Sequence, residues 1–135
     1  MRAKATGVRW VAGALILGIA LEAPLTSARA EPRQVFGYAG ELGEWELVAS
    51  VTEQTASQAG EFSGPLTMTH VGLCTADGPE ERKGEIRVRI SETSMRATIS
   101  VDGVACSYRG RLSDFYDGTM SCPDRPAVPL KIWLK

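Results

Sequence analysis

Residues 85–122, which read EIRVRISETSMRATISVDGVACSYRGRLSDFYDGTMSC, decide the fold. Apolar and polar residues alternate along most of this stretch, and a period of two is typical of half-buried β-strands. The dipeptide Asp102-Gly103 separates two such runs and predicts a tight hairpin, because both central positions of its turn favour a positive φ. The stretch therefore predicts four antiparallel strands, at residues 85–91, 95–101, 104–112 and 116–122.

The turns between these strands also predict their registers. We expect a two-residue turn at 102–103, a four-residue loop at 91–94 and a three-residue turn at 113–115. The apolar residues of all four strands then share one face, and a slip of one residue would break this agreement. The predicted partners are Val101 with Val104, Ile99 with Cys106, Ala97 with Tyr108, Ile90 with Met95, Val88 with Ala97, Cys106 with Cys122, Tyr108 with Met120 and Gly110 with Gly118.

Three further segments with strand character extend the pattern, at residues 44–51, 66–73 and 130–134. A sheet of about seven strands must hide its edges, so the fold class is all-β. We expect an antiparallel meander that closes as a small lipocalin-like barrel or packs as a two-sheet sandwich, with the barrel preferred. Pairing of the last strand with the first would bring Trp133 close to Trp45. Residues 54–64 and 75–84 are rich in polar residues and glycine and predict solvated loops.

The first thirty residues differ in kind from the rest of the chain. Residues 1–9 carry Arg2, Lys4 and Arg9 without an acid, and residues 10–21 are uncharged. The small residues of Ala28-Arg29-Ala30 suit a cleavage site, so residues 1–30 resemble a secretory signal peptide that is cleaved after Ala30. An uncleaved anchor is the alternative, but the apolar run is too short to span a bilayer. We therefore expect a periplasmic or secreted protein with no membrane span after cleavage.

Removal of this segment changes the charge of the chain. The whole chain carries 15 basic and 16 acidic residues, whereas residues 31–135 carry 11 and 15, a net charge of −4. Such a mildly acidic chain lacks the basic footprint of nucleic-acid binding. We expect an N-terminal arm at residues 31–43 and a single β-domain at 44–135, which is a monomer.

The chain contains three cysteines, which are Cys74, Cys106 and Cys122. Disulfides persist in exported proteins, and an odd count leaves one thiol outside any intramolecular bridge. The predicted register favours a Cys106–Cys122 disulfide, and Cys74 is the alternative partner of either. A more specific alternative is a zinc site formed by the three cysteines and His70, but no C-x2-C pair supports it. We expect no metal and no cofactor.

Catalytic groups are scarce in this sequence. His70 is the only histidine, and a half-buried strand position is the favoured interpretation for it. The sequence holds no G-x-S-x-G elbow, phosphate loop or dinucleotide fingerprint, so we expect no enzyme. The outward positions of the central strands carry Arg87, Arg89, Arg96, Arg109 and Arg111. They could form an anion-binding surface, although a solvated sheet face is the favoured interpretation.

Short motifs resemble known families. Gly43-Glu44-Trp45 is similar to the Gly-x-Trp that opens lipocalin-like barrels, where the tryptophan closes the barrel base. The chain also resembles uncharacterised families of small exported bacterial proteins, in Gly43-Glu44-Trp45-Glu46, Cys74-Thr75 and Tyr116-Asp117-Gly118-Thr119-Met120. The second resemblance implies an exported β-rich domain and carries no activity or functional residue.

These observations favour a binding module of the bacterial cell envelope. We expect a small β-domain without enzymatic activity that binds a small apolar ligand or a protein partner. Aromatic side chains are good ligand anchors, so the candidate binding residues are Trp45, Tyr108, Tyr116 and Trp133. The alternative function is a secreted enzyme inhibitor that uses the N-terminal arm or the loops.

Overall fold

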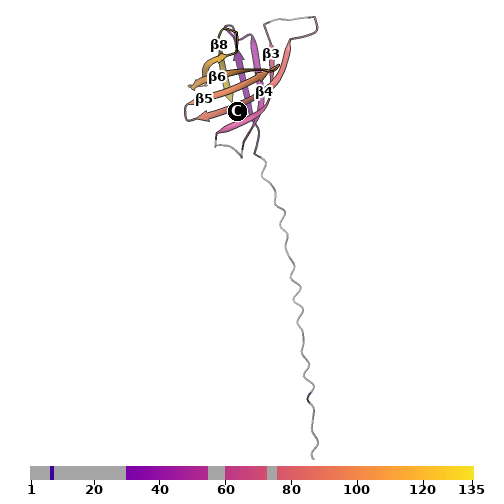
Figure 1. Cartoon of the computed structure of the whole chain (residues 1–135), viewed down its shortest axis with the longest axis vertical. Helices are drawn as coiled ribbons and strands as arrows, with labels where there is room; N and C mark the ends of the chain where they lie inside the picture. The colour runs from indigo at the N-terminus through magenta and orange to yellow at the C-terminus, as the bar shows by residue number, and fades with distance from the viewer. Residues whose placement is uncertain (1–6, 8–29, 55–59, 73–75) are drawn as a thin grey trace, which may run out of the picture.

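The computed structural model describes residue 7 and residues 30–54, 60–72 and 76–135 (Figure 1). Eight strands form a closed antiparallel barrel in which each strand pairs with its neighbours in sequence and β1 pairs with β8. The strands are β1 (Arg33–Ala39), β2 (Trp45–Glu53), β3 (Glu61–His70), β4 (Glu81–Ser91), β5 (Ser94–Val101), β6 (Val104–Leu112), β7 (Tyr116–Ser121) and β8 (Val128–Leu134). The predicted all-β barrel is confirmed, with one strand more than expected.

Two sequence predictions fall largely or wholly outside the described residues. The signal peptide at 1–30 is described only at Gly7 and Ala30, and Cys74 is not described. No helix in the described ranges is long and apolar enough to cross a lipid bilayer.

The predicted registers of β4 to β7 are confirmed. Ile99 pairs with Cys106, and Tyr108 pairs with Met120. Asp102 and Gly103 have φ values of 51° and 78°, as a two-residue hairpin turn requires. The β4–β5 turn is tighter than the four-residue loop we expected, because Ser91 pairs with Ser94, but the register is the same.

The predicted N-terminal arm is wrong, since residues 33–39 form β1 and pair on both sides. The inward residues of β1 are Val35, Gly37 and Ala39, whereas the aromatic residues Phe36 and Tyr38 face outward. Small inward residues hide the alternation on which the strand predictions relied. Gly37 is needed at this point, because a Cβ there would lie 2.7 Å from the carbonyl oxygen of Lys131 on β8.

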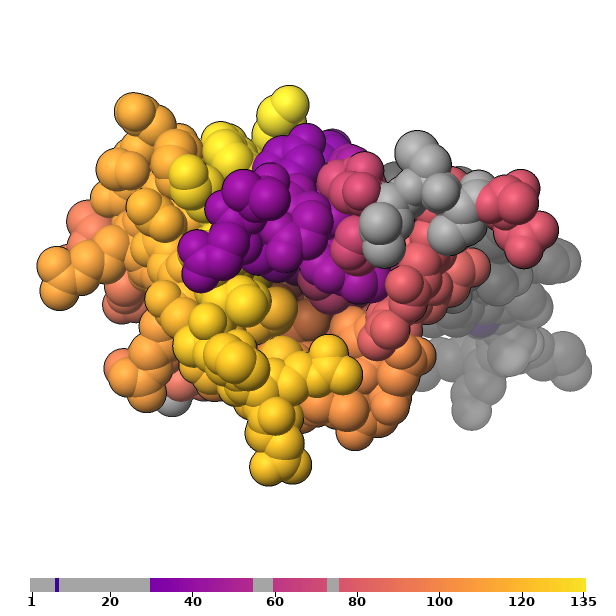
Figure 2. Space-filling view, turned by 90° about the horizontal axis from the view of Figure 1, so that it is seen from above, coloured from indigo at the N-terminus to yellow at the C-terminus, as the bar shows by residue number. Residues whose placement is uncertain are grey.

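The last strand was expected to pair with the strand at residues 44–51, and this prediction is also wrong. β8 pairs with β1, and Figure 2 shows these two segments, in yellow and indigo, side by side. Trp133 lies opposite Phe36, whereas Trp45 lies opposite Ala39 and His70. Because β1 separates β2 from β8, the two tryptophans do not share a neighbourhood.

Strands β3 and β4 are longer than the sequence predicted. Residues 61–64 and 81–84 were expected in loops, but Gly64 pairs with Ile86 and Glu81 pairs with Thr69. Charged side chains are compatible with strands at these positions, because the outer face of the barrel is exposed to solvent. The extension of β4 brings Arg82 into the barrel wall.

The inward side chains form one core that fills most of the barrel. An eight-stranded barrel has an interior about wide enough for side chains alone or for one small ligand. The largest fully buried side chains are Tyr108, Leu47, Leu66, Ile86, Met95, Ile99, Leu130, Ile132, Val35, Val51 and Val88. The middle of the barrel is therefore packed, and open space can exist only towards its ends.

Candidate ligand-binding site at the barrel mouth

The barrel is open at the end that carries the β1–β2, β5–β6 and β7–β8 connections, which we call the mouth. A cavity of about 310 Å³ lies there. Its wall includes the largely apolar side chains of Trp45, Met68, Ile99, Met120 and Val128. Its rim carries the charged residues Glu44, Arg82, Asp102 and Arg125. The cavity thus combines an apolar wall with a polar edge, which is the usual composition of a small-molecule site.

A disulfide forms part of the cavity wall. Cys106 on β6 is bonded to Cys122, which follows β7 directly, and their Cα atoms are 4.3 Å apart. The bond continues the register of Ser107 with Ser121 by one pair. The predicted Cys106–Cys122 disulfide is confirmed, and the alternatives in which Cys74 bonds either residue are wrong. The bridge ties the ends of β6 and β7 together at the mouth.

Arg82 is the most constrained charge at the rim. Its Nε and Nη2 atoms donate hydrogen bonds of 2.9 and 2.8 Å to Oε1 of Glu80. Nη1 lies 3.7 Å from Oδ2 of Asp102, and the guanidinium lies 5.5 Å from the centre of the Trp45 ring. Hydrogen bonding to Glu80 and the charge of Glu80 raise the pKa of Arg82, with a smaller contribution from Asp102, while burial opposes the shift. A fixed positive charge therefore stands beside the tryptophan face.

The sequence did not identify Arg82 as a site residue, because it lies in a segment that was predicted to be a loop. A signal was present: the inward alternation of Ile86 and Gly84 continues backwards to position 82. If β4 is extended to residue 81, this alternation predicts that Arg82 lies at an inward position near the end of the barrel.

Trp45 also packs against the only histidine. The ring centres of Trp45 and His70 are 4.6 Å apart, with the rings nearly perpendicular at 85°. His70 is half-buried at the end of β3, and its Nδ1 atom is buried without a hydrogen-bond partner in the described part of the chain. Among the described residues, no group of three His, Cys, Asp or Glu side chains could hold a metal ion. His70 therefore supports the Trp45 ring by packing.

The structure separates the four predicted binding residues. Trp45 lines the mouth. Tyr108 and Tyr116 are buried in the core, where the hydroxyl of Tyr108 donates a hydrogen bond to the carbonyl oxygen of Tyr116. Trp133 lies on the outside of the barrel, with its ring centre 4.8 Å from that of Phe115. Only Trp45 can contact a ligand in the mouth.

Comparison with protein-family models and with curated proteins finds no match to this chain. The resemblance to small exported bacterial families therefore stays a prediction, and the geometry of the mouth carries the functional argument.

Proposed function

We propose that this protein is an exported binding module without enzymatic activity that takes a small apolar ligand at the barrel mouth. The observation that carries the proposal is the open cavity of about 310 Å³ with Trp45, Met68 and Met120 in its wall. Ligand pockets typically have volumes of about 300–1,000 Å³ and are mostly apolar, with a few polar groups that orient the ligand.

The packed core limits the size of such a ligand. Leu47, Ile86, Tyr108 and Ile132 are at most 1% exposed and fill the middle of the barrel. A ligand in the mouth therefore cannot pass into the middle of the barrel, so its apolar part contacts the wall and any polar part meets the charged rim.

Two features support export and a role in binding. The Cys106–Cys122 disulfide fits an oxidising compartment, in agreement with the signal peptide that the sequence predicts. His70, the only histidine of the chain, packs on Trp45, and its buried Nδ1 has no hydrogen-bond partner among the described residues. The disulfide thus supports export, and the packing of His70 favours binding over catalysis.

A pair of matched variants tests the proposal. Val104 and Leu112 lie at opposite ends of β6, and their side chains are 45% and 44% exposed. Val104 lines the mouth, whereas Leu112 does not. A tryptophan at position 104 fills part of the cavity, and the same substitution at position 112 adds equal bulk at the other end.

The measurement is the fluorescence of the neutral apolar dye N-phenylnaphthylamine titrated with the oxidised protein. We expect saturable binding to the wild type and to Leu112→Trp, and binding at least about tenfold weaker to Val104→Trp, equivalent to about 1.4 kcal/mol. Circular dichroism verifies that both variants are folded. Absence of saturable binding, or equal loss in both variants, would refute the proposal.

The structure does not support the alternative function in which the protein is an enzyme inhibitor that uses an N-terminal arm. Residues 33–39 are paired on both sides within the barrel, so they do not form a free arm. The version that uses the loops stays a prediction.

A further inference from the structure

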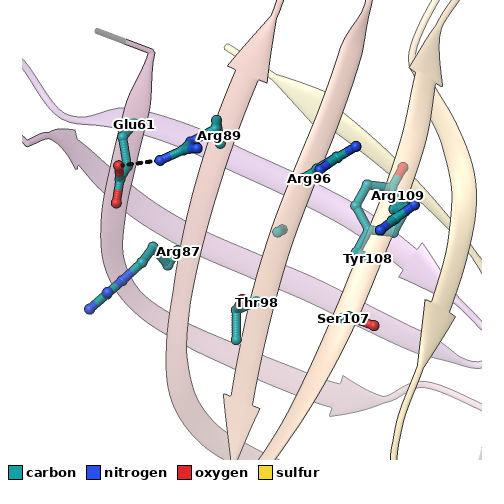
Figure 3. Close-up of a pocket in the computed structure, with 9 residues that line it drawn as sticks. Glu61, Arg87, Arg89, Arg96, Thr98, Ser107, Tyr108 and Arg109 are labelled. Atoms are coloured by element: carbon teal, nitrogen blue, oxygen red, sulfur yellow. Dashed lines mark hydrogen bonds and ion pairs between the residues drawn. The ribbon is translucent and has the colours of Figure 1, made fainter. Parts of the chain in front are cut away.

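The outer face of strands β4, β5 and β6 carries a row of arginines. Arg89 on β4 pairs with Arg96 on β5, and Arg96 pairs with Arg109 on β6. Figure 3 shows the three side chains on neighbouring strands, with Arg89 directed towards Glu61. Because neighbouring strands lie about 4.8 Å apart, three successive pairing positions span about 10 Å across the sheet.

This arrangement is unfavourable for the barrel alone. Like charges directly opposite each other on paired strands destabilise a sheet. One arginine of the row has an acidic partner, since Arg89 Nη2 lies 3.2 Å from Oε2 of Glu61. Within the described part of the chain, no acidic group lies within ion-pair distance of Arg96 or Arg109. The row thus keeps an uncompensated positive charge in a chain whose total charge is negative.

The row also lines a depression in the surface of about 320 Å³. Arg87, Thr98 and Ser107 add to its polar lining, and Glu61 is the only acidic residue among the described residues that line it. Planar guanidinium groups bind phosphate-type oxyanions with two parallel hydrogen bonds, and hydroxyl groups can add further donors. The lining therefore has the chemistry of an oxyanion site.

We propose that this depression binds a ligand that carries two or three linked phosphoryl groups. A single exposed ion pair contributes only about 0–1 kcal/mol, so one small anion would gain little on this open surface. An oligophosphate can contact several guanidinium groups at once and removes the repulsion between Arg89, Arg96 and Arg109. The site lies on the outer face of the barrel and is separate from the mouth, so it does not depend on the function proposed above.

The chain offers a matched control for this site. Arg111 lies on the same strand and the same face as Arg109, but it pairs with Asp117 on β7 and does not line the depression. Replacement of Arg96 or Arg111 by glutamine removes the same charge from the protein. Only the first replacement removes a guanidinium from the proposed site.

The test is calorimetric titration of the oxidised protein with inorganic tripolyphosphate at low ionic strength. We expect Arg96→Gln and Arg109→Gln to bind about tenfold more weakly, which corresponds to one lost charged hydrogen bond, and Arg111→Gln to bind within about twofold of the wild type. Glu61→Gln should bind more tightly, because Arg89 is released from its partner. Orthophosphate should bind more weakly than tripolyphosphate.

Several outcomes would overturn the proposal. Equal loss in Arg96→Gln and Arg111→Gln would mean that only the net charge matters. Binding to phosphatidylglycerol vesicles without binding to tripolyphosphate would assign the face to a membrane surface instead. A thermal melt without phosphate adds a second readout: Arg96→Gln should raise the Tm because it removes two like-charge contacts, and a lower Tm would contradict the repulsion on which the proposal rests.

Discussion

The hydroxyl of Tyr108 on β6 donates a hydrogen bond of 3.2 Å to the backbone carbonyl of Tyr116 on β7. The ring of Tyr108 also lies against Gly110. The contact is so close that a Cβ at position 110 would overlap the phenol. One buried side chain therefore links the two strands of a hairpin and covers a glycine that leaves room for it. Aromatic side chains that cover glycines in this way help to fix the register of a sheet.

Substitutions at this pair should separate the hydrogen bond from the packing. We expect Tyr108→Phe to lower the free energy of unfolding by about 1 kcal/mol, the usual value of a buried hydrogen bond. Gly110→Ala should lower it more, by about 1–3 kcal/mol, because the added methyl group overpacks the core. Urea unfolding measures both, and the change at Gly110 should shrink when position 108 is alanine. A full effect of Gly110→Ala in that background would contradict the close contact.

The same tyrosine should make the barrel sensitive to alkali. Burial raises the pKa of Tyr108, with smaller contributions from Asp117 and Tyr116. The neutral phenol therefore contributes stability that is fully present below the unfolded pKa of about 10 and is lost as the pH rises towards the folded-state pKa. Above pH 10, the wild type should lose up to about 1.4 kcal/mol per pH unit more than Tyr108→Phe. Urea unfolding between pH 8 and 11.5 tests this, and parallel curves for the two proteins would disprove it.

Loss of the disulfide should weaken the mouth. Cys106 and Cys122 lie 16 positions apart in the sequence, and the chain-entropy model assigns about 3 kcal/mol to a bridge that closes a loop of this length. We expect the double variant Cys106→Ala/Cys122→Ala to lose about this amount in urea unfolding. Reduction should not destabilise this variant further. Labelling of the denatured, unreduced wild type with iodoacetamide should add one group per chain, and reduction should expose two more thiols.

Deletion of residues 31–39 distinguishes a strand from an arm. Because β1 closes the ring between β2 and β8, its loss opens two edges and exposes the apolar interior. We expect the truncated protein to lose its cooperative thermal transition or to aggregate. A truncated chain that melts like the wild type would show that β1 is dispensable.

Tryptophan fluorescence should report where a ligand binds. Trp45 lines the mouth, and Trp133 packs against Phe115 on the outside of the barrel. When an apolar ligand without fluorescence of its own enters the mouth, the emission of Trp45 should change. The response should persist in Trp133→Phe and disappear in Trp45→Phe. The reverse result would move the site to the outer face.

The sequence predicts the centre of the barrel better than its closure. Asp102-Gly103 and strict alternation specify the registers of β4 to β7, and those registers already place Arg89, Arg96 and Arg109 in one row. The partner of Arg89 could not be predicted, because Glu61 lies in a segment whose composition is typical of a loop.

Strand β1, which closes the barrel, was not predicted, and the reason is different. Two of the three residues of β1 that face the core, Gly37 and Ala39, are small, so hydrophobic alternation is weak there. Gly37 must be small because it approaches the backbone of Lys131. Without β1, the partner of β8 was assigned wrongly, and Trp133 was expected near the wrong neighbour. Arg82 was missed because residues 75–84 were predicted to be a loop, whereas residues 81–84 belong to β4.

The ends of the barrel sequence meet on the side away from the mouth. The backbone groups of Gln34 and Lys135 exchange hydrogen bonds of 3.1 and 2.9 Å, next to the last pairs of β1 and β8. A short linker between residues 135 and 31 could therefore join them, and the chain could be cut at the β4–β5 turn between residues 92 and 93. Such a circular permutant would keep every strand pair, so the order in which the eight strands are synthesised is separable from the structure that they form.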